Sequence, residues 1–211
     1  MSTEVKSKEK VNMDPKYIIK LTVTLFVTCV VVAGALGLVN SVTEGPIAQI
    51  NKEKTETAMK AVVADPDNST FSDALELTDE MTSAALSAGG TLTEAYEVQV
   101  DGEPAGYAFK VVASGSQGNI EMMVGLDADG IVTGVSVVDS SETAGIGTKV
   151  TGNEPLSNGG GRVLDQFIGK SAADGTLTVG SNVVAITGAT VSTKGVTTGV
   201  NAALAVDAVM G

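Results

Sequence analysis

The sequence predicts an α+β fold, with an N-terminal transmembrane helix followed by a domain in which an antiparallel sheet is flanked by helices. Three observations lead to this prediction. Residues 21–43 form an apolar run without a charged residue. Short stretches between residues 96 and 138 alternate apolar and polar side chains, which is the two-residue period of strands. Residues 193–210 then carry small apolar side chains at helical spacing.

The apolar run is long enough to cross a bilayer. As a helix, residues 21–39 would span about 28 Å, close to the hydrocarbon thickness of a membrane. A cleaved signal peptide is the alternative, with Ala33-Gly34-Ala35 as its cleavage site. The long basic segment before the run favours a retained anchor with a cytoplasmic N-terminus and an external domain, because it contains Lys6, Lys8, Lys10, Lys16 and Lys20.

These patterns divide the chain into four segments. After the apolar run, Gly45-Pro46 is a candidate bend, and helical spacing continues to about Ala64. Residues 78–93 have the composition of a connector. We therefore expect a cytoplasmic N-terminus, a transmembrane helix, a helical stalk with its connector, and an extracytoplasmic domain, at residues 1–20, 21–43, 44–93 and 94–211.

The extracytoplasmic domain begins with a predicted antiparallel meander. Its expected strands are 96–100, 106–113, 120–126 and 131–138. The acidic turn 127–130 could begin a calcium loop, but it lacks the downstream oxygen ligands, so a hairpin turn and no metal site are expected. After a loop rich in glycine and hydroxyls, the sequence predicts a short amphipathic helix, an apolar strand and a closing helix, at residues 162–168, 183–186 and 193–210.

The composition restricts the possible chemistry. The net charge of -12 disfavours a nucleic-acid-binding protein, which needs a basic face. Histidine and tryptophan are absent, so histidine-based triads and zinc sites are excluded. The single Cys29 excludes an internal disulfide and a cysteine-held iron–sulfur cluster. Any chemistry must therefore come from hydroxyls, amides, carboxylates or a bound cofactor.

The first candidate site is Thr187-Gly188-Ala189-Thr190-Val191-Ser192-Thr193-Lys194, at the expected entrance of the closing helix. Glycine and alanine allow a ligand to approach the backbone closely. Free amides and the helix dipole favour an anion there, and Lys194 could add positive charge. Ordinary capping of the helix by Ser192 or Thr193 is the alternative.

The second candidate site is Ser141-Glu142-Thr143-Ala144-Gly145-Ile146-Gly147-Thr148-Lys149, which follows the last expected strand. Its amides and threonine hydroxyls could bind a planar or phosphorylated ligand. A polar turn is the alternative. The nearby Asn158-Gly159-Gly160-Gly161 lacks the GK[ST] sequence of a phosphate loop, so we interpret it as a linker.

These two segments resemble a known family. Thr187-Gly188-Ala189-Thr190 is similar to the (S/T)GAT flavinylation motif of FMN-binding domains, and residues 141–147 resemble their ETPGLG-type loop. Together with one N-terminal span, the order of these motifs resembles the family of G subunits of Rnf ion-translocating ferredoxin:NAD oxidoreductases. The C subunits of sodium-pumping NADH:quinone oxidoreductases are close relatives of that family.

The resemblance implies a covalent cofactor and its site. Thr190 matches the threonine whose hydroxyl forms a phosphoester with FMN, which a separate flavin transferase takes from FAD with magnesium. The chain departs from the family pattern at Val184, often Asp, at Ala144, usually Pro, and at Ile146, usually Leu. The other implied FMN-binding residues are Thr187, Gly188 and Ala189 of the flavinylation motif, and Glu142, Thr143, Gly145 and Gly147 of the loop.

The resemblance also implies a role. The chain would relay electrons as a redox subunit of a complex that couples electron transfer between ferredoxin and NAD⁺ to translocation of Na⁺ or H⁺. Its expected partners are the other membrane subunits, including a second FMN-bearing subunit, and the flavin transferase. Two alternatives remain: a flavoprotein subunit of a quinone reductase or of an extracellular electron-transfer system, and a flavin-free extracytoplasmic binding domain.

Overall fold

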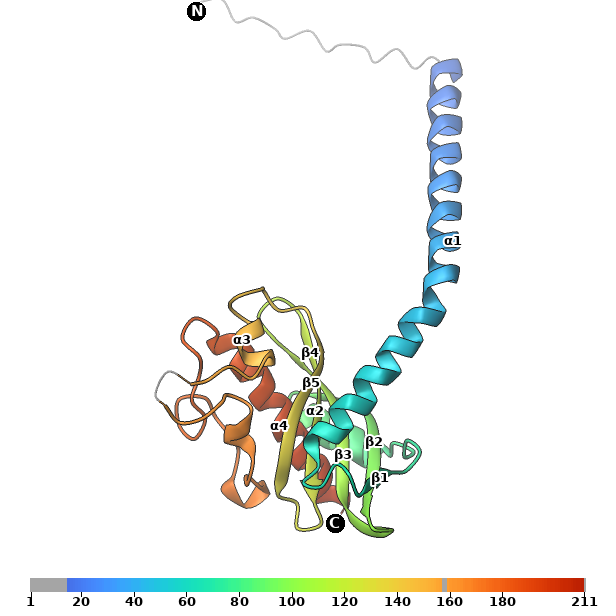
Figure 1. The fold of residues 1–211 in the computed structure, drawn as a ribbon. Coiled ribbons are helices and arrows are strands. Elements are labelled where there is room, and N and C mark those ends of the chain that lie inside the picture. The colour runs from blue at the N-terminus through green and yellow to red at the C-terminus, as the bar shows by residue number, and fades with distance from the viewer. Residues whose placement is uncertain (1–14, 157–158, 211) are drawn as a thin grey trace, which may run out of the picture. The chain divides into compact units, whose positions relative to one another are not determined.

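The computed structural model describes residues 15–156 and 159–210. The lysines at positions 6, 8 and 10 and the start of the Asn158–Gly161 run lie outside the described residues. The described residues fall into two compact units, which divide between Asn51 and Lys52. Figure 1 shows the elements of both units along the chain.

The first unit is the N-terminal part of helix α1 (Pro15–Val62). An 18-residue window of this helix has a mean hydropathy of 2.4, and none of that window is buried within the protein. Its length and composition are those of a helix that can cross a membrane. The helix continues through Pro46, so the expected anchor and stalk helices are one element of 48 residues.

The second unit contains a five-stranded antiparallel sheet. Its order follows the chain, β1-β2-β3-β4-β5, so the predicted meander is confirmed (Figure 1). The short β1 was not predicted, because three residues are too few to show an alternating pattern. The strands are β1 (Ser69–Phe71), β2 (Thr91–Val100), β3 (Glu103–Ser114), β4 (Asn119–Asp127) and β5 (Val132–Ser140).

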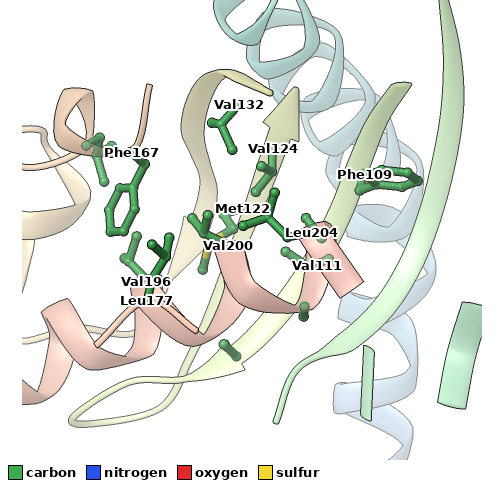
Figure 2. Packing of buried hydrophobic residues seen from close by; sticks show 14 of the residues in the cluster. Phe109, Val111, Met122, Val124, Val132, Phe167, Leu177, Val196, Val200 and Leu204 are labelled. Carbon is green, nitrogen blue, oxygen red and sulfur yellow. The ribbon is translucent and has the colours of Figure 1, made fainter. Parts of the chain in front are cut away.

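One face of the sheet packs against helices α4 (Thr190–Met210) and α2 (Asp79–Ser87). Figure 2 shows apolar side chains of α4 beside those of the sheet, including Val200 beside Met122. Gly199 permits this close approach, since a Cβ there would lie 2.5 Å from the Met122 sulfur. The main core lies between these two layers.

The last turns of α1 cover part of the opposite face. Val62 is fully buried, and its carbonyl oxygen accepts a hydrogen bond from Thr133 Oγ1 at 2.5 Å. Gly125 and Gly134 lie beside this helix end, where a Cβ at either position would meet the backbone of Val62. Glycine is therefore required sterically at this contact.

Helix α2 lies in the segment that we expected to be a connector. Its start is capped by Thr78, whose hydroxyl oxygen accepts a hydrogen bond from Met81 N at 3.2 Å. Two of the nine helical residues, Met81 and Ala85, are buried. Because so few residues are buried, the apolar residues of α2 show little helical periodicity in the sequence. The capping residue Thr78 was the feature that could have indicated the start of this helix.

Two further local predictions were wrong. The expected helix 162–168 is a single 3-10 turn, η1 (Asp165–Phe167). The expected strand 183–186 is one bridge between Val183 and Val179. The amide of Gln166 takes the place of a neighbouring strand, because it accepts from Val184 N at 2.7 Å and donates to Val184 O at 3.1 Å. The short elements α3 (Thr148–Thr151) and η2 (Ala172–Asp174) complete the fold.

Candidate functional site

The two candidate segments meet in one cavity. The loop after β5 and the start of α4 line it together, with one residue from the turn between β3 and β4. The cavity has a volume of about 160 Å³. Its lining residues are Ser116, Glu142, Thr143, Ile146, Gly147, Gly188, Ala189, Thr190, Val191 and Ser192.

Glu142 connects the three segments. Its side chain is buried, and Oε1 accepts hydrogen bonds from Ser116 N at 2.7 Å and Gln117 N at 3.3 Å. Its other oxygen, Oε2, accepts a short hydrogen bond from the hydroxyl of Ser192 on α4. The carboxylate therefore ties the β3–β4 turn to the first turn of α4.

Glycines make room for this carboxylate. A Cβ at Gly115 would collide with Glu142 Oε1, and one at Gly147 would collide with Oε2. The loop is itself an ordered turn, since Thr148 N donates to Thr143 O at 3.3 Å. Gly145 has a φ of +77°, and its N–H donates to Thr148 Oγ1 at 2.8 Å. The expected alternative of a polar turn is thus a correct description of the loop's backbone, and this turn also lines the cavity.

The start of α4 leaves backbone donors free. Thr193 N donates to Ala189 O at 2.9 Å, which is the first helical hydrogen bond. Within the described part of the chain, the amides of Thr190, Val191 and Ser192 have no hydrogen-bond acceptor. Ala189 lacks a side-chain acceptor that could cap the helix. Three unpaired donors at a helix N-terminus form a local environment that favours an anion.

Capping by Ser192 or Thr193 was the expected alternative for this segment, and it is wrong. The helix begins at Thr190, so both residues lie inside its first turn. Ser192 donates to Glu142, and Thr193 Oγ1 donates to Ala189 O at 3.0 Å.

The hydroxyls near the helix start differ in accessibility. Ser192 and Thr193 are 1% and 0% exposed, and their hydroxyl hydrogens are donated within the protein. Thr190 is exposed, lines the cavity, and its hydroxyl has no hydrogen-bond partner among the described residues. Thr187 is also exposed, but it is not a lining residue. Thr190 is therefore the accessible hydroxyl of α4 at the cavity.

The cavity contains most of the residues that the sequence singled out. Gly145 lies in the same loop without lining the cavity, and the exposed Lys194 does not line it either. Ser116 is the lining residue that sequence reasoning missed. The available signal was the run Gly115–Gly118 between two predicted strands, which indicates a turn but not its proximity to α4.

The comparisons with known proteins agree on one family. Residues 115–205 match the FMN-binding domain family, and this range contains every residue that lines the cavity. The G subunit of the Na⁺-translocating ferredoxin:NAD⁺ oxidoreductase complex of Acetobacterium woodii is 36% identical over 96% of this chain and 97% of its own length. The G subunit of the ion-translocating oxidoreductase complex of Methanosarcina acetivorans is 30% identical over 90% of this chain and 95% of its own length.

A solved structure is also similar, although more distantly. The C subunit of the Na⁺-translocating NADH-quinone reductase from Parabacteroides distasonis covers 75% of this chain and 90% of its own, with a TM-score of 0.44 and 17% identity. The assignment depends on the two full-length sequence relatives and on the matched domain. This chain belongs to the family of G subunits of the ion-translocating Rnf oxidoreductase complexes, and it contains an FMN-binding domain.

Proposed function

We propose that this chain is a single-pass membrane subunit that carries one FMN, bound through a phosphoester to Thr190, and relays electrons within an Rnf-type complex. The observation that carries the proposal is the position of Thr190. Its exposed hydroxyl lies in the cavity, at a helix start with three unpaired amides, inside the matched FMN-binding domain. The (S/T)GAT resemblance of residues 187–190 supports the same residue.

The residues present fit the phosphate end of FMN. The amides of Thr190, Val191 and Ser192 are donors without acceptors, and phosphate oxygens are the acceptors that a helix N-terminus binds best. The cavity of about 160 Å³ is smaller than the roughly 300–1,000 Å³ typical of sites that enclose a whole ligand. We therefore assign this cavity to the phosphate, with the larger ring system outside it.

Apolar side chains are available at the mouth of the cavity. Ile146 and Val191 line it and are 51% and 54% exposed. Exposed apolar side chains beside a polar site are suited to cover one edge of a planar aromatic group. Four of the other implied binding residues also line the cavity, namely Thr143 and Gly147 of the loop and Gly188 and Ala189 immediately before α4.

The cofactor would supply the redox chemistry, because FMN accepts and donates one or two electrons. The protein's own contribution is to retain and position it. A covalent phosphoester prevents loss of the flavin outside the cytoplasm, and the turn at 143–148 and the first turn of α4 fix its attachment point. The single cysteine, Cys29, lies in α1 and not at the cavity.

We place α1 across the membrane with its N-terminus in the cytoplasm. The apolar part of the helix is exposed along its length, and five lysines precede residue 21. Positively charged segments remain on the cytoplasmic side of a membrane, so the FMN-binding domain would lie outside. This orientation agrees with the proposed segments 1–20, 21–43, 44–93 and 94–211.

The relatives' names support the proposed reaction and partners. The Acetobacterium woodii protein is named as part of a Na⁺-translocating ferredoxin:NAD⁺ oxidoreductase complex. We extend this to the present chain: it would act with the other membrane subunits of such a complex, a second FMN-bearing one among them, in coupling this electron transfer to movement of Na⁺ or H⁺. A flavin transferase would attach the FMN during maturation.

Co-expression with a flavin transferase tests the attachment. The full chain is denatured, separated by gel electrophoresis and examined for flavin fluorescence, alongside Thr190→Val and the control Thr176→Val, an exposed threonine outside the cavity and the flavinylation motif. We expect fluorescence in the wild type and in Thr176→Val, and none in Thr190→Val. Fluorescence that survives Thr190→Val would move the attachment to another hydroxyl. Absence of fluorescence from the wild type, with a transferase shown to be active on another acceptor, would refute the covalent flavin.

A further inference from the structure

We propose that Glu142 is the positioning residue for flavin attachment, and that it acts through Ser192 to hold the first turn of α4 with Thr190 facing the cavity. This inference rests on the function proposed above and extends it. The observation that carries it is the hydrogen bond between the Ser192 hydroxyl and Glu142 Oε2, which joins residues fifty positions apart in the chain.

Helix geometry explains how an anchor at Ser192 orients Thr190. Residues two apart on an α-helix project in nearly opposite directions, because each residue turns the helix by about 100°. Ser192 is 1% exposed and faces the interior, whereas Thr190 is exposed. The hydrogen bond that holds the buried Ser192 therefore also fixes the rotation of the helix start that leaves Thr190 exposed at the cavity.

The carboxylate is held firmly enough to act as an anchor. Both of its oxygens are engaged, one by the amides of Ser116 and Gln117 and the other by Ser192. Hydrogen bonds to a charged acceptor are stronger than those between neutral groups. The β3–β4 turn is continuous with two core strands, so the start of α4 is tied to the sheet of the main core.

Two glycines beside Glu142 leave the space that its carboxylate occupies. Gly115 and Gly147 each leave space that a methyl group would take from the carboxylate. Glycine at both positions lets the two turns approach one side chain from opposite sides. The carboxylate thus lies between two backbone segments, next to the helix start that it orients.

The reaction that this arrangement prepares is a phosphoryl-type transfer without change of oxidation state. A bond forms between Thr190 Oγ1 and the phosphorus of the FMN half of FAD. The bond from that phosphorus to the bridging oxygen breaks, AMP leaves with that oxygen, and the threonine proton is released. The transferase supplies the magnesium and the catalytic groups, while Glu142 contributes the position of the attacking hydroxyl.

The experiment measures the rate at which a transferase attaches FMN from FAD to the purified full chain in detergent. The variants are Glu142→Ala, Glu142→Gln, Ser192→Ala and the double variant Glu142→Ala with Ser192→Ala. Asp127→Asn is the matched control, since Asp127 Oδ1 also accepts two turn amides, Asp129 N at 3.0 Å and Ile131 N at 2.9 Å, in the β4–β5 turn. Hydrogen exchange of the flavin-free proteins reports the order of peptides containing residues 115–118 and 187–196.

We expect Glu142→Ala and Ser192→Ala each to lower the attachment rate by about tenfold, as loss of a hydrogen bond to a charged group would. The double variant should be no slower than the slower single variant, because both remove the same link. Glu142→Gln, which can still bridge the two segments, should stay within about threefold of the wild type. Exchange should quicken in the two named peptides in Glu142→Ala, and Asp127→Asn should retain the wild-type rate.

Four results would overturn the proposal. A wild-type rate in Glu142→Ala would remove its basis. Multiplicative effects in the double variant would show that Glu142 does not act through Ser192. A rate in Glu142→Gln as low as in Glu142→Ala would assign the effect to charge instead of position. A wild-type attachment rate in Ser192→Ala would also contradict the proposal. If Glu142→Ala does not fold, the rates of Ser192→Ala and Glu142→Gln test the proposal without it. Failure of the wild type to accept flavin would instead refute the proposed function.

Discussion

Gly125 of β4 lies directly opposite Gly134 of β5 in the sheet, and the end of α1 rests on this pair. The contact is made by the backbone of Val62, whose carbonyl oxygen is also held by Thr133. Two adjacent glycines in paired strands form a smooth patch on the pleated surface, since neither carries a side chain. The end of α1 therefore packs directly on this glycine pair, on strands that belong to the matched FMN-binding domain.

The first prediction concerns this contact between α1 and the glycine pair. A Cβ at Gly134 would lie 2.8 Å from Val62 Cα, and the neighbouring backbone cannot give way easily. We expect Gly134→Ala to lower the free energy of unfolding by about 1–3 kcal/mol, as overpacking does. Urea unfolding measures the change. Gly37→Ala is the control, because a Cβ there meets nothing outside its own helix, and its stability should equal or exceed that of the wild type. Equal stability of Gly134→Ala and the wild type would contradict the contact.

The second prediction concerns Asp207 near the end of α4. Burial, followed by the charge of Asp127, raises the pKa of Asp207 above its usual 3.8. A raised pKa means that the charged form is disfavoured in the folded state, so ionisation of Asp207 costs stability at neutral pH. We expect Asp207→Asn to be more stable at pH 7 by about 1 kcal/mol or less, since solvent screens this partly exposed group.

The pH dependence distinguishes this cause from others. The advantage of Asp207→Asn should shrink as the pH falls through the raised pKa, and it should vanish below 3.8, where the wild-type carboxyl is protonated in both states. Thermal unfolding of both proteins across this range measures it, with Asp129→Asn as an exposed control. A stability difference that is independent of pH would contradict the explanation.

The third prediction concerns alkaline solution and the network around Glu94. The Tyr96 hydroxyl donates to Glu94 Oε2 at 2.5 Å, and Lys110 Nζ lies 3.3 Å from Glu94 and 2.7 Å from Glu121. Burial and Glu94 raise the pKa of Tyr96 above 10.0. Burial alone would lower the pKa of Lys110, but the two carboxylates outweigh it and raise the pKa above 10.5.

Both groups hold their protons more tightly in the folded state. Their contribution to stability is therefore complete below about pH 10 and is lost as the pH rises through their raised pKa values. We expect the free energy of unfolding to fall above about pH 10, and to fall less steeply in Tyr96→Phe, which lacks the titrating hydroxyl. Urea unfolding at several alkaline pH values tests this. The same slope in both proteins would exclude Tyr96 as a source of the loss.

The sequence was sufficient for the parts of the fold that repeat regularly. Alternation between residues 96 and 138 predicted the meander because each strand has one face against the core. The apolar run predicted a helix able to cross a membrane. Helix α2 escaped prediction because it buries only Met81 and Ala85 among its nine residues. The expected strand at Val183 failed because a side chain, Gln166, satisfies the backbone that a strand would otherwise pair.

The candidate site was likewise predictable only in part from the sequence. Glycines and hydroxyls marked both segments, and the structure brings Glu142 and Thr190 to one cavity. The sequence could not show that Ser192 is buried against Glu142, or that Ser116 approaches from another turn, because these contacts join segments that are 26 and 50 residues apart. Such contacts follow from how the meander and α4 pack, which no local pattern encodes.

The most direct test of the account is to locate the flavin within the chain. The full-length protein, flavinylated by a transferase, is digested with trypsin and analysed by fragmentation mass spectrometry of the peptide 171–194, which contains Thr187, Thr190, Ser192 and Thr193. We expect an FMN phosphoester on Thr190 and on no other hydroxyl of this peptide. An FMN group on Ser192, Thr193 or Thr187, or a peptide without modification from a fluorescent protein, would contradict it.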